Sequence, residues 1–73
     1  MKGGELMQTL KEARIARGIR QNAVANALKI TRQTYAKYED KPYLMPVYQA
    51  KAACYFIGCD IDEIYFGSDV STA

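Results

Sequence analysis

Four residues near the middle of the chain, Arg32, Gln33, Ala36 and Lys37, have the spacing that places side chains on one face of a helix. Arginine and lysine donate hydrogen bonds to guanine O6 and N7, and glutamine forms a paired contact with adenine N6 and N7. Ala36 leaves room for close approach and can touch a thymine methyl group. A helix with this face is suited to reading base edges in the DNA major groove. The competing interpretation is a solvated polar face on an ordinary helical bundle.

Residues that support catalysis or metal binding are scarce in this sequence. It has no histidine and only two cysteines, Cys54 and Cys59, so a zinc site would lack ligands and a disulfide framework is not indicated. We expect two reduced, largely buried thiols. Asp60, Asp62 and Glu63 lack the spacing of a calcium-binding loop, and helix capping explains them better. We therefore expect no enzymatic activity, no metal and no cofactor.

Length and charge limit the classes of protein to which the chain can belong. Its 73 residues are enough for one domain with one small hydrophobic core. Residues 1–41 carry nine lysines and arginines against four carboxylates, whereas residues 42–73 carry one lysine against four carboxylates. A basic first half favours a polyanionic partner. No apolar run has the length of a membrane helix and no secretory signal is evident, so we expect a cytoplasmic protein without membrane contact.

The periodicity of apolar residues predicts an all-α fold of five short helices. The compact domain is expected over residues 6–67, with a flexible lead-in at 1–5 and a flexible tail at 68–73. The first helix is predicted over 6–17, with Gly18 ending it, and the second over 21–28. The residues expected to face inward from the second helix are Val24, Ala25 and Leu28.

The third helix is predicted to begin after the N-cap residue Thr31 and to pack through Tyr35 and Tyr38. It should end at Asp40-Lys41-Pro42, because the residue before a proline avoids the helical region. Residues 43–45 are then expected to form an extended loop.

Proline and glycine delimit the predicted fourth helix, which runs from Pro46 to Ile57 and is closed by Gly58. Asp60 is expected to cap a fifth helix over 61–66, with Glu63 in the capping-box position. The residues expected to face inward from the fourth helix are Val47, Ala50, Cys54 and Ile57.

Two short helices joined by a tight turn form a helix-turn-helix, whose second helix enters the major groove, and residues 21–38 fit this arrangement. Residues 10–66 resemble the Cro/repressor class of helix-turn-helix regulators, the XRE family. The resemblance rests on three ordered segments, which are Leu10-Lys11-Glu12-Ala13-Arg14 with Gly18-Ile19-Arg20-Gln21, the run from Ala25 to Glu39, and Ile57-Gly58-Cys59-Asp60-Ile61-Asp62-Glu63-Ile64-Tyr65. It implies a lambda-repressor-like DNA-binding domain.

The resemblance also implies roles for single residues. The base-contacting positions of the family fall on Arg32, Gln33, Ala36 and Lys37. Gln21 resembles the residue that holds a DNA phosphate at a helix N-terminus. Arg14 and Glu39 resemble a structural ion pair between the first helix and the end of the third. The positions from which we expect phosphate contacts are Arg20, Gln21, Asn22, Thr31, Thr34 and Lys41.

The chain departs from the family pattern at several positions, and after the third helix Lys41-Pro42 replaces the expected glycine. The loop that follows lacks the extra basic residues that many relatives use on the DNA backbone. Lys29 stands where the turn usually has glycine, so it either adopts a left-handed conformation at a cost of about 1 kcal/mol or changes the turn locally. Arg20 replaces the usual serine or threonine cap of the second helix and has no side-chain oxygen with which to cap it.

These features favour a sequence-specific transcriptional regulator of the phage Cro/repressor type, acting in a lysis–lysogeny switch. Its expected partner is double-stranded DNA, bound as a homodimer on half-sites about 34 Å apart. An antitoxin is one alternative, and another is a modulator that binds a partner repressor protein.

Surplus aromatic residues favour the partner-repressor alternative, because exposed aromatic patches mark protein contacts. Packing of loop 42–46 over the same rings is the competing explanation. The residues of the possible protein interface are Tyr48, Lys51, Tyr55, Tyr65 and Phe66.

Overall fold

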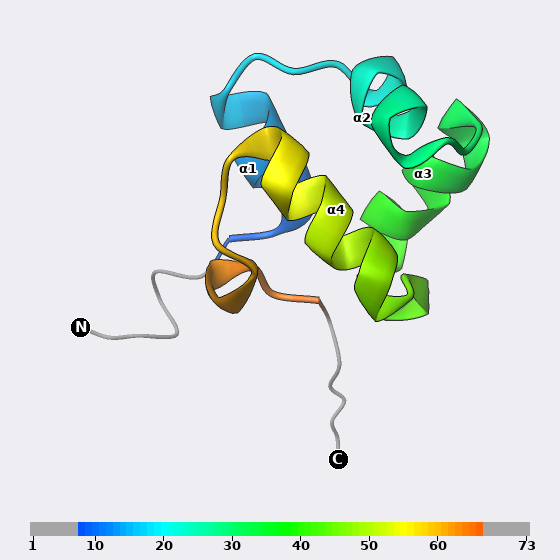
Figure 1. Ribbon diagram of the computed structural model, residues 1–73. Helices are drawn as coiled ribbons and strands as arrows, with labels where there is room; N and C mark the ends of the chain where they lie inside the picture. The colour runs from blue at the N-terminus through cyan, green and yellow to red at the C-terminus, as the bar shows by residue number, and fades with distance from the viewer. Residues whose placement is uncertain (1–7, 67–73) are drawn as a thin grey trace.

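The computed structural model describes residues 8–66, which form four α-helices and two short 3-10 segments (Figure 1). The predicted all-α class is confirmed, whereas the predicted count of five helices is wrong. The predicted lead-in at 1–5 and tail at 68–73 lie outside the described residues. The elements are α1 (Leu10–Ala16), α2 (Gln21–Leu28), α3 (Arg32–Asp40), η2 (Pro42–Leu44), α4 (Val47–Ile57) and η3 (Ile61–Glu63).

Helix α1 begins at Leu10, four residues later than predicted, because a capping box fixes its start. The Thr9 side chain accepts a hydrogen bond from the Glu12 backbone amide at 3.1 Å, and the Glu12 carboxylate accepts one from the Thr9 amide at 2.9 Å. Gln8 precedes this cap and pairs with Ile64 in an isolated parallel bridge, so its backbone is not helical. At the other end Gly18 takes the left-handed conformation expected of it, with φ +68°.

The segment from α2 to α3 has the predicted form. Helix α2 spans the predicted residues, and Thr31 caps α3 by accepting a hydrogen bond from the Thr34 amide at 3.1 Å. Lys29 occupies the left-handed region with φ 62° and ψ 41°, the first of the two conformations considered for it. Its backbone conformation lets the Ile30 amide donate to the Ala25 carbonyl at 3.0 Å, which closes the turn. Arg20 makes no side-chain capping bond, as expected.

Two predictions for the second half of the chain are wrong. Residues 42–44 form the 3-10 turn η2 instead of an extended loop, with the Met45 amide donating to the Pro42 carbonyl at 3.0 Å. The predicted fifth helix shrinks to η3, because Ile64 turns extended to pair with Gln8 and the Tyr65 amide donates to the Gln8 carbonyl at 2.9 Å. The predicted Asp60 cap is present, and its carboxylate accepts from the Asp62 amide at 3.0 Å.

One continuous core lies between the helices, with α4 running between α1 and the α2–α3 pair (Figure 1). Tyr35, Leu10 and Val24 are the largest side chains that are completely buried. Val47 was predicted to face inward but is 68% exposed, because Met45 fills that end of the core and Val47 lies on an open groove. The buried residues of α4 are Gln49, Ala50, Ala53, Cys54 and Ile57. Within residues 8–66, no helix combines the length and apolar character needed to cross a membrane.

Candidate nucleic-acid interface

Helix α3 presents a polar face to solvent and an apolar face to the core. Arg32, Gln33 and Lys37 are exposed, and Ala36 between them is partly buried. On the opposite face Tyr35 is completely buried in the core. The four residues predicted to contact bases therefore lie on one accessible surface, and the three long side chains among them carry hydrogen-bond donors.

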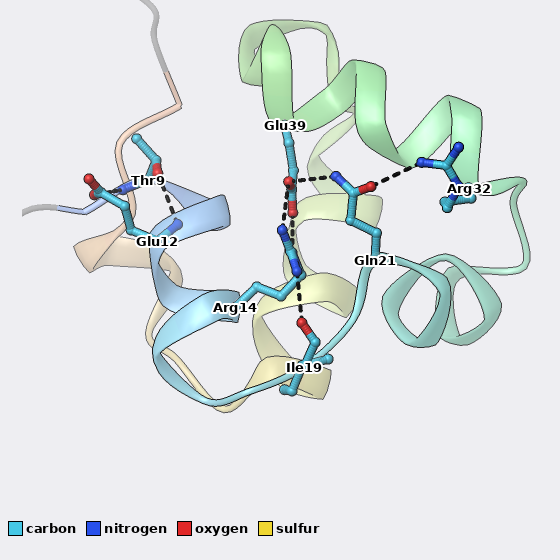
Figure 2. A network of polar contacts seen from close by, with 7 residues as sticks. All are labelled: Thr9, Glu12, Arg14, Ile19, Gln21, Arg32 and Glu39. Carbon is cyan, nitrogen blue, oxygen red and sulfur yellow. Dashed lines mark hydrogen bonds and ion pairs between the residues drawn. The ribbon is translucent and has the colours of Figure 1, made fainter.

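The Gln21 side chain at the start of α2 bridges two residues of α3 (Figure 2). Its amide oxygen accepts a hydrogen bond from Arg32 Nη1 at 3.1 Å, and its amide nitrogen donates to Glu39 Oε1 at 2.9 Å. Arg32 has only donors and a carboxylate has only acceptors, so just one orientation of the amide satisfies both neighbours. Gln21 thereby holds the Arg32 guanidinium at the N-terminal end of α3.

Arg14 and Glu39 form the ion pair at the centre of this network (Figure 2). Arg14 Nε lies 2.6 Å from Glu39 Oε2 and Nη2 lies 3.2 Å from Oε1, while Nη1 donates to the Ile19 carbonyl at 2.8 Å. The exposed fractions of the two side chains are 10% and 3%. The pair ties α1 and the connection after it to the last turn of α3.

This arrangement shifts the pKa values of both partners. The hydrogen bond to Glu39 raises the pKa of Arg14. Burial by itself raises the pKa of Glu39, but hydrogen bonds to its charged form, with Arg14 foremost, outweigh burial and lower that pKa below its ordinary value. Both groups are therefore charged at neutral pH, as their bidentate geometry requires.

The Tyr35 hydroxyl lies in the same buried region, where burial and then the neighbouring Glu39 carboxylate raise its pKa. Among the described residues this oxygen has no hydrogen-bond partner of acceptable geometry. Tyr35 thus anchors α3 through the packing of its ring, and its hydroxyl lies close enough to Glu39 for that carboxylate to raise its pKa.

The six residues predicted to contact phosphates lie around the two helix starts and the end of α3. Arg20, Asn22 and Lys41 are exposed, while Gln21 is half-buried within the network. The Thr31 hydroxyl donates to Thr34 Oγ1 at 3.0 Å, which orders the pair at the start of α3.

Lys11 is a surface cation that the sequence reasoning did not select. It lines a shallow polar groove together with Gln21, Ala36, Glu39 and Asp40. The signal available in the sequence was its position three residues before Arg14, which places both cations on one face of α1.

The residues predicted as a possible protein interface are arranged in two ways. Tyr48 and Tyr55 are 71% and 90% exposed, so the loop 42–46 does not cover their rings, and Lys51 between them is also exposed. Tyr65 is half exposed. Phe66 instead packs against the core and lines an apolar groove beside η2 and α4.

Comparison with known proteins agrees with this geometry. Residues 10–42 match a family model described as helix-turn-helix. Neither a curated protein nor a solved structure matches the chain. The matched segment contains α1, α2 and α3, and with them the ion pair and the whole polar face of α3. Residues 10–42 therefore form a helix-turn-helix, which supports a DNA-binding transcriptional regulator of the XRE type.

Proposed function

We propose that the protein recognises specific sites in double-stranded DNA by placing α3 in the major groove. The observation that carries this proposal is the exposed row Arg32, Gln33 and Lys37 on a helix whose other face is anchored by Tyr35. Arg32 and Lys37 donate to guanine, Gln33 pairs with adenine, and Ala36 approaches a thymine methyl group. Each good bidentate pair discriminates against a wrong base by about 1–3 kcal/mol.

Phosphate contacts then fix the register of α3 on the duplex. Arg20 and Asn22 lie at the N-terminus of α2, where the helix dipole attracts a phosphate. Their exposed side chains add hydrogen-bond donors for the same phosphate. Gln21 contributes its backbone amide, since its side chain is engaged with Arg32 and Glu39. The remaining contacts in this proposal come from Thr31, Thr34 and Lys41.

Two copies of the chain act together in this proposal. One domain of this size buries too little surface on DNA for tight specific binding. Two copies on half-sites about 34 Å apart present their reading helices to successive major grooves on one side of the duplex. Occupying such an operator excludes polymerase or a competing regulator, which is the mode of action of a Cro/repressor-type protein in a phage genetic switch.

The test begins with selection of preferred sites from a pool of random DNA duplexes, followed by fluorescence anisotropy at several salt concentrations. Arg32→Ala should weaken binding to the selected site by about 1–3 kcal/mol and relax the preference at one base position. Arg20→Ala should weaken all sequences alike and reduce the salt slope by about 1.

Lys51→Ala is the matched control, because it removes one charge from an exposed position on α4, outside the matched segment. On a duplex with a single half-site, where contacts between copies play no part, it should leave affinity within about twofold and the salt slope nearly unchanged. Absence of any salt-dependent binding at micromolar protein concentration would reject the proposal.

A second candidate function is binding of a partner repressor protein, and the exposure of Tyr48 and Tyr55 favours it. A reporter of regulation separates the two functions. If Tyr48→Ala or Tyr55→Ala abolishes regulation while Arg32→Ala and Lys37→Ala leave it intact, partner binding is the main activity. Because both tyrosines are exposed, their replacement should not unfold the domain, and circular dichroism checks this.

A further inference from the structure

The C-terminal end of α4 brings the two cysteines of the chain together. Gly58 adopts the left-handed conformation with φ +92°, and the amides of Gly58 and Cys59 donate to the Cys54 carbonyl at 2.8 and 3.0 Å. A left-handed glycine at a helix end commonly closes the last turn with a hydrogen bond between two residues that are five positions apart. This closure brings the side chains of those two residues into contact. In this chain those two side chains are Cys54 and Cys59.

The hydrogen bonding across this helix end favours a covalent bond between the two sulfurs. A disulfide requires Cα atoms about 4.4–6.8 Å apart, and the hydrogen bond from the Cys59 amide to the Cys54 carbonyl, 3.0 Å long, holds the two backbones close together. Cys54 is buried and Cys59 is half-buried against the core. Burial, and then the adjacent Cys59 thiol, raise the pKa of Cys54 to about 12. The Cys59 thiol therefore lies close to the Cys54 thiol.

We propose that Cys54 and Cys59 are a thiol oxidation site that reacts with small-molecule disulfides such as oxidised glutathione to form a reversible intramolecular disulfide. In the first step the more accessible Cys59 attacks one sulfur of oxidised glutathione. A mixed disulfide forms between Cys59 and one glutathione. The other glutathione leaves as the thiol and takes up the proton that Cys59 lost. In the second step Cys54 loses its proton and attacks the Cys59 sulfur, which releases a second reduced glutathione. Two protein thiols are oxidised and one glutathione disulfide is reduced.

The location of this pair predicts what the disulfide would fix. The Gly58 carbonyl between the cysteines accepts a hydrogen bond from Arg17 Nη2 at 3.0 Å, so this helix end is also a contact with the end of α1. Oxidation would fasten the end of α4 to the segment that leads into η3. The cysteines lie outside residues 10–42, so the oxidised protein retains the reading face of α3.

The experiment equilibrates the purified protein in mixtures of reduced and oxidised glutathione, with and without concentrated urea. Acid quenching, alkylation of free thiols and mass spectrometry then count the species. We expect a product about 2 Da lighter than the reduced chain and without alkylated cysteine. Because the folded helix end holds the sulfurs together, the ratio of disulfide to dithiol should be at least about tenfold higher in the folded protein than in urea.

An equal or lower ratio in the folded protein would overturn the proposal, because it would mean that the fold opposes the bond. A mixed disulfide at Cys59 as the final product, or a disulfide between two chains, would overturn it as well. Cys59→Ser and Cys54→Ser are the matched controls, and neither should give the lighter product. The main comparison uses only the unaltered sequence, so it stands even if Cys54→Ser fails to fold, and it does not depend on DNA binding.

Discussion

Removal of the Glu39 carboxylate is the most direct test of what holds α3 in place. Three hydrogen bonds converge on this group, two from Arg14 and one from Gln21, and its side chain is only 3% exposed. Removing one partner of a buried ion pair costs about 3–5 kcal/mol, because the other charge is left without compensation. We expect Glu39→Ala to cost about 3 kcal/mol, near the lower limit, since Arg14 keeps its bond to the Ile19 carbonyl.

Urea unfolding followed by circular dichroism measures this loss, and Asp40→Ala is the matched control. Asp40 is the next residue, is also acidic and is exposed, so its replacement should change the free energy of unfolding by less than about 0.5 kcal/mol. For a domain of this size, the loss at Glu39 corresponds to a fall in Tm of roughly 12–24 °C. If Glu39→Ala and Asp40→Ala differ by less than about 1 kcal/mol, the ion pair does not have the role given to it here.

The same carboxylate has a consequence for pH dependence. The pKa of Glu39 is lowered in the folded protein, so its contribution to stability is fully present above the ordinary glutamate value of 4.5 and is lost as the pH falls through the folded value. Wild-type protein should therefore lose more stability than Glu39→Gln when the pH is lowered from 5 to about 3. Parallel losses in the two proteins would contradict the direction of the shift.

Three further changes test single features of the helix-turn-helix. Lys29→Gly should stabilise the domain by about 1 kcal/mol in thermal unfolding, because glycine adopts the left-handed conformation without strain, and a loss would refute that reasoning. Tyr35→Phe removes a buried hydroxyl without a partner and should leave stability unchanged or raise it by up to about 1 kcal/mol, whereas a clear loss would reveal a bond to Glu39. Gln21→Ala removes the hydrogen bond that orients Arg32. In DNA titrations it should therefore weaken affinity less when Arg32 is already alanine, and additive losses of affinity in the double variant would argue against the bridge.

The helix-turn-helix itself was predictable because its signals are local. The cap at Thr31, the apolar spacing of α2 and the stop at Lys41-Pro42 act within a few residues of the positions they determine. For Lys29, comparison with the family pattern left two conformations open, and the structure has the left-handed one.

Two of the errors, at the start of α1 and at η3, arose where distant segments meet. The predicted fifth helix became η3 because Ile64 pairs with Gln8, and this pairing also excludes Gln8 from α1. The apolar periodicity of either segment does not predict that its backbone pairs with residues more than fifty positions away. The capping box of α1 was nevertheless a local signal, in the spacing of Thr9 and Glu12, and it would have placed the start of that helix correctly.

The candidate interface also combines features that the sequence predicts with features that depend on contacts between helices. The exposed row on α3 followed from helical spacing, whereas the bridge from Gln21 to Arg32 depends on how α2 packs against α3 and has no signature in the sequence. The resemblance to the family implied that Gln21 holds a DNA phosphate through its side chain and its backbone amide. In the structure both ends of its amide are already occupied by protein groups, so a phosphate contact through the backbone amide is the one that leaves the network intact.

In the proposed complex with DNA, this network makes stability and base reading depend on the same few atoms. Glu39 holds Arg14 on one side and the Gln21 amide on the other, and the far end of that amide holds Arg32. A change at Glu39 therefore loosens the contact between α1 and α3 and at the same time removes support from Arg32, the side chain proposed to contact a base. The position of α3 is set by packing at Tyr35 and by a buried ion pair, and neither depends on the DNA sequence that α3 is proposed to read, so the helix would keep the same register on different sites.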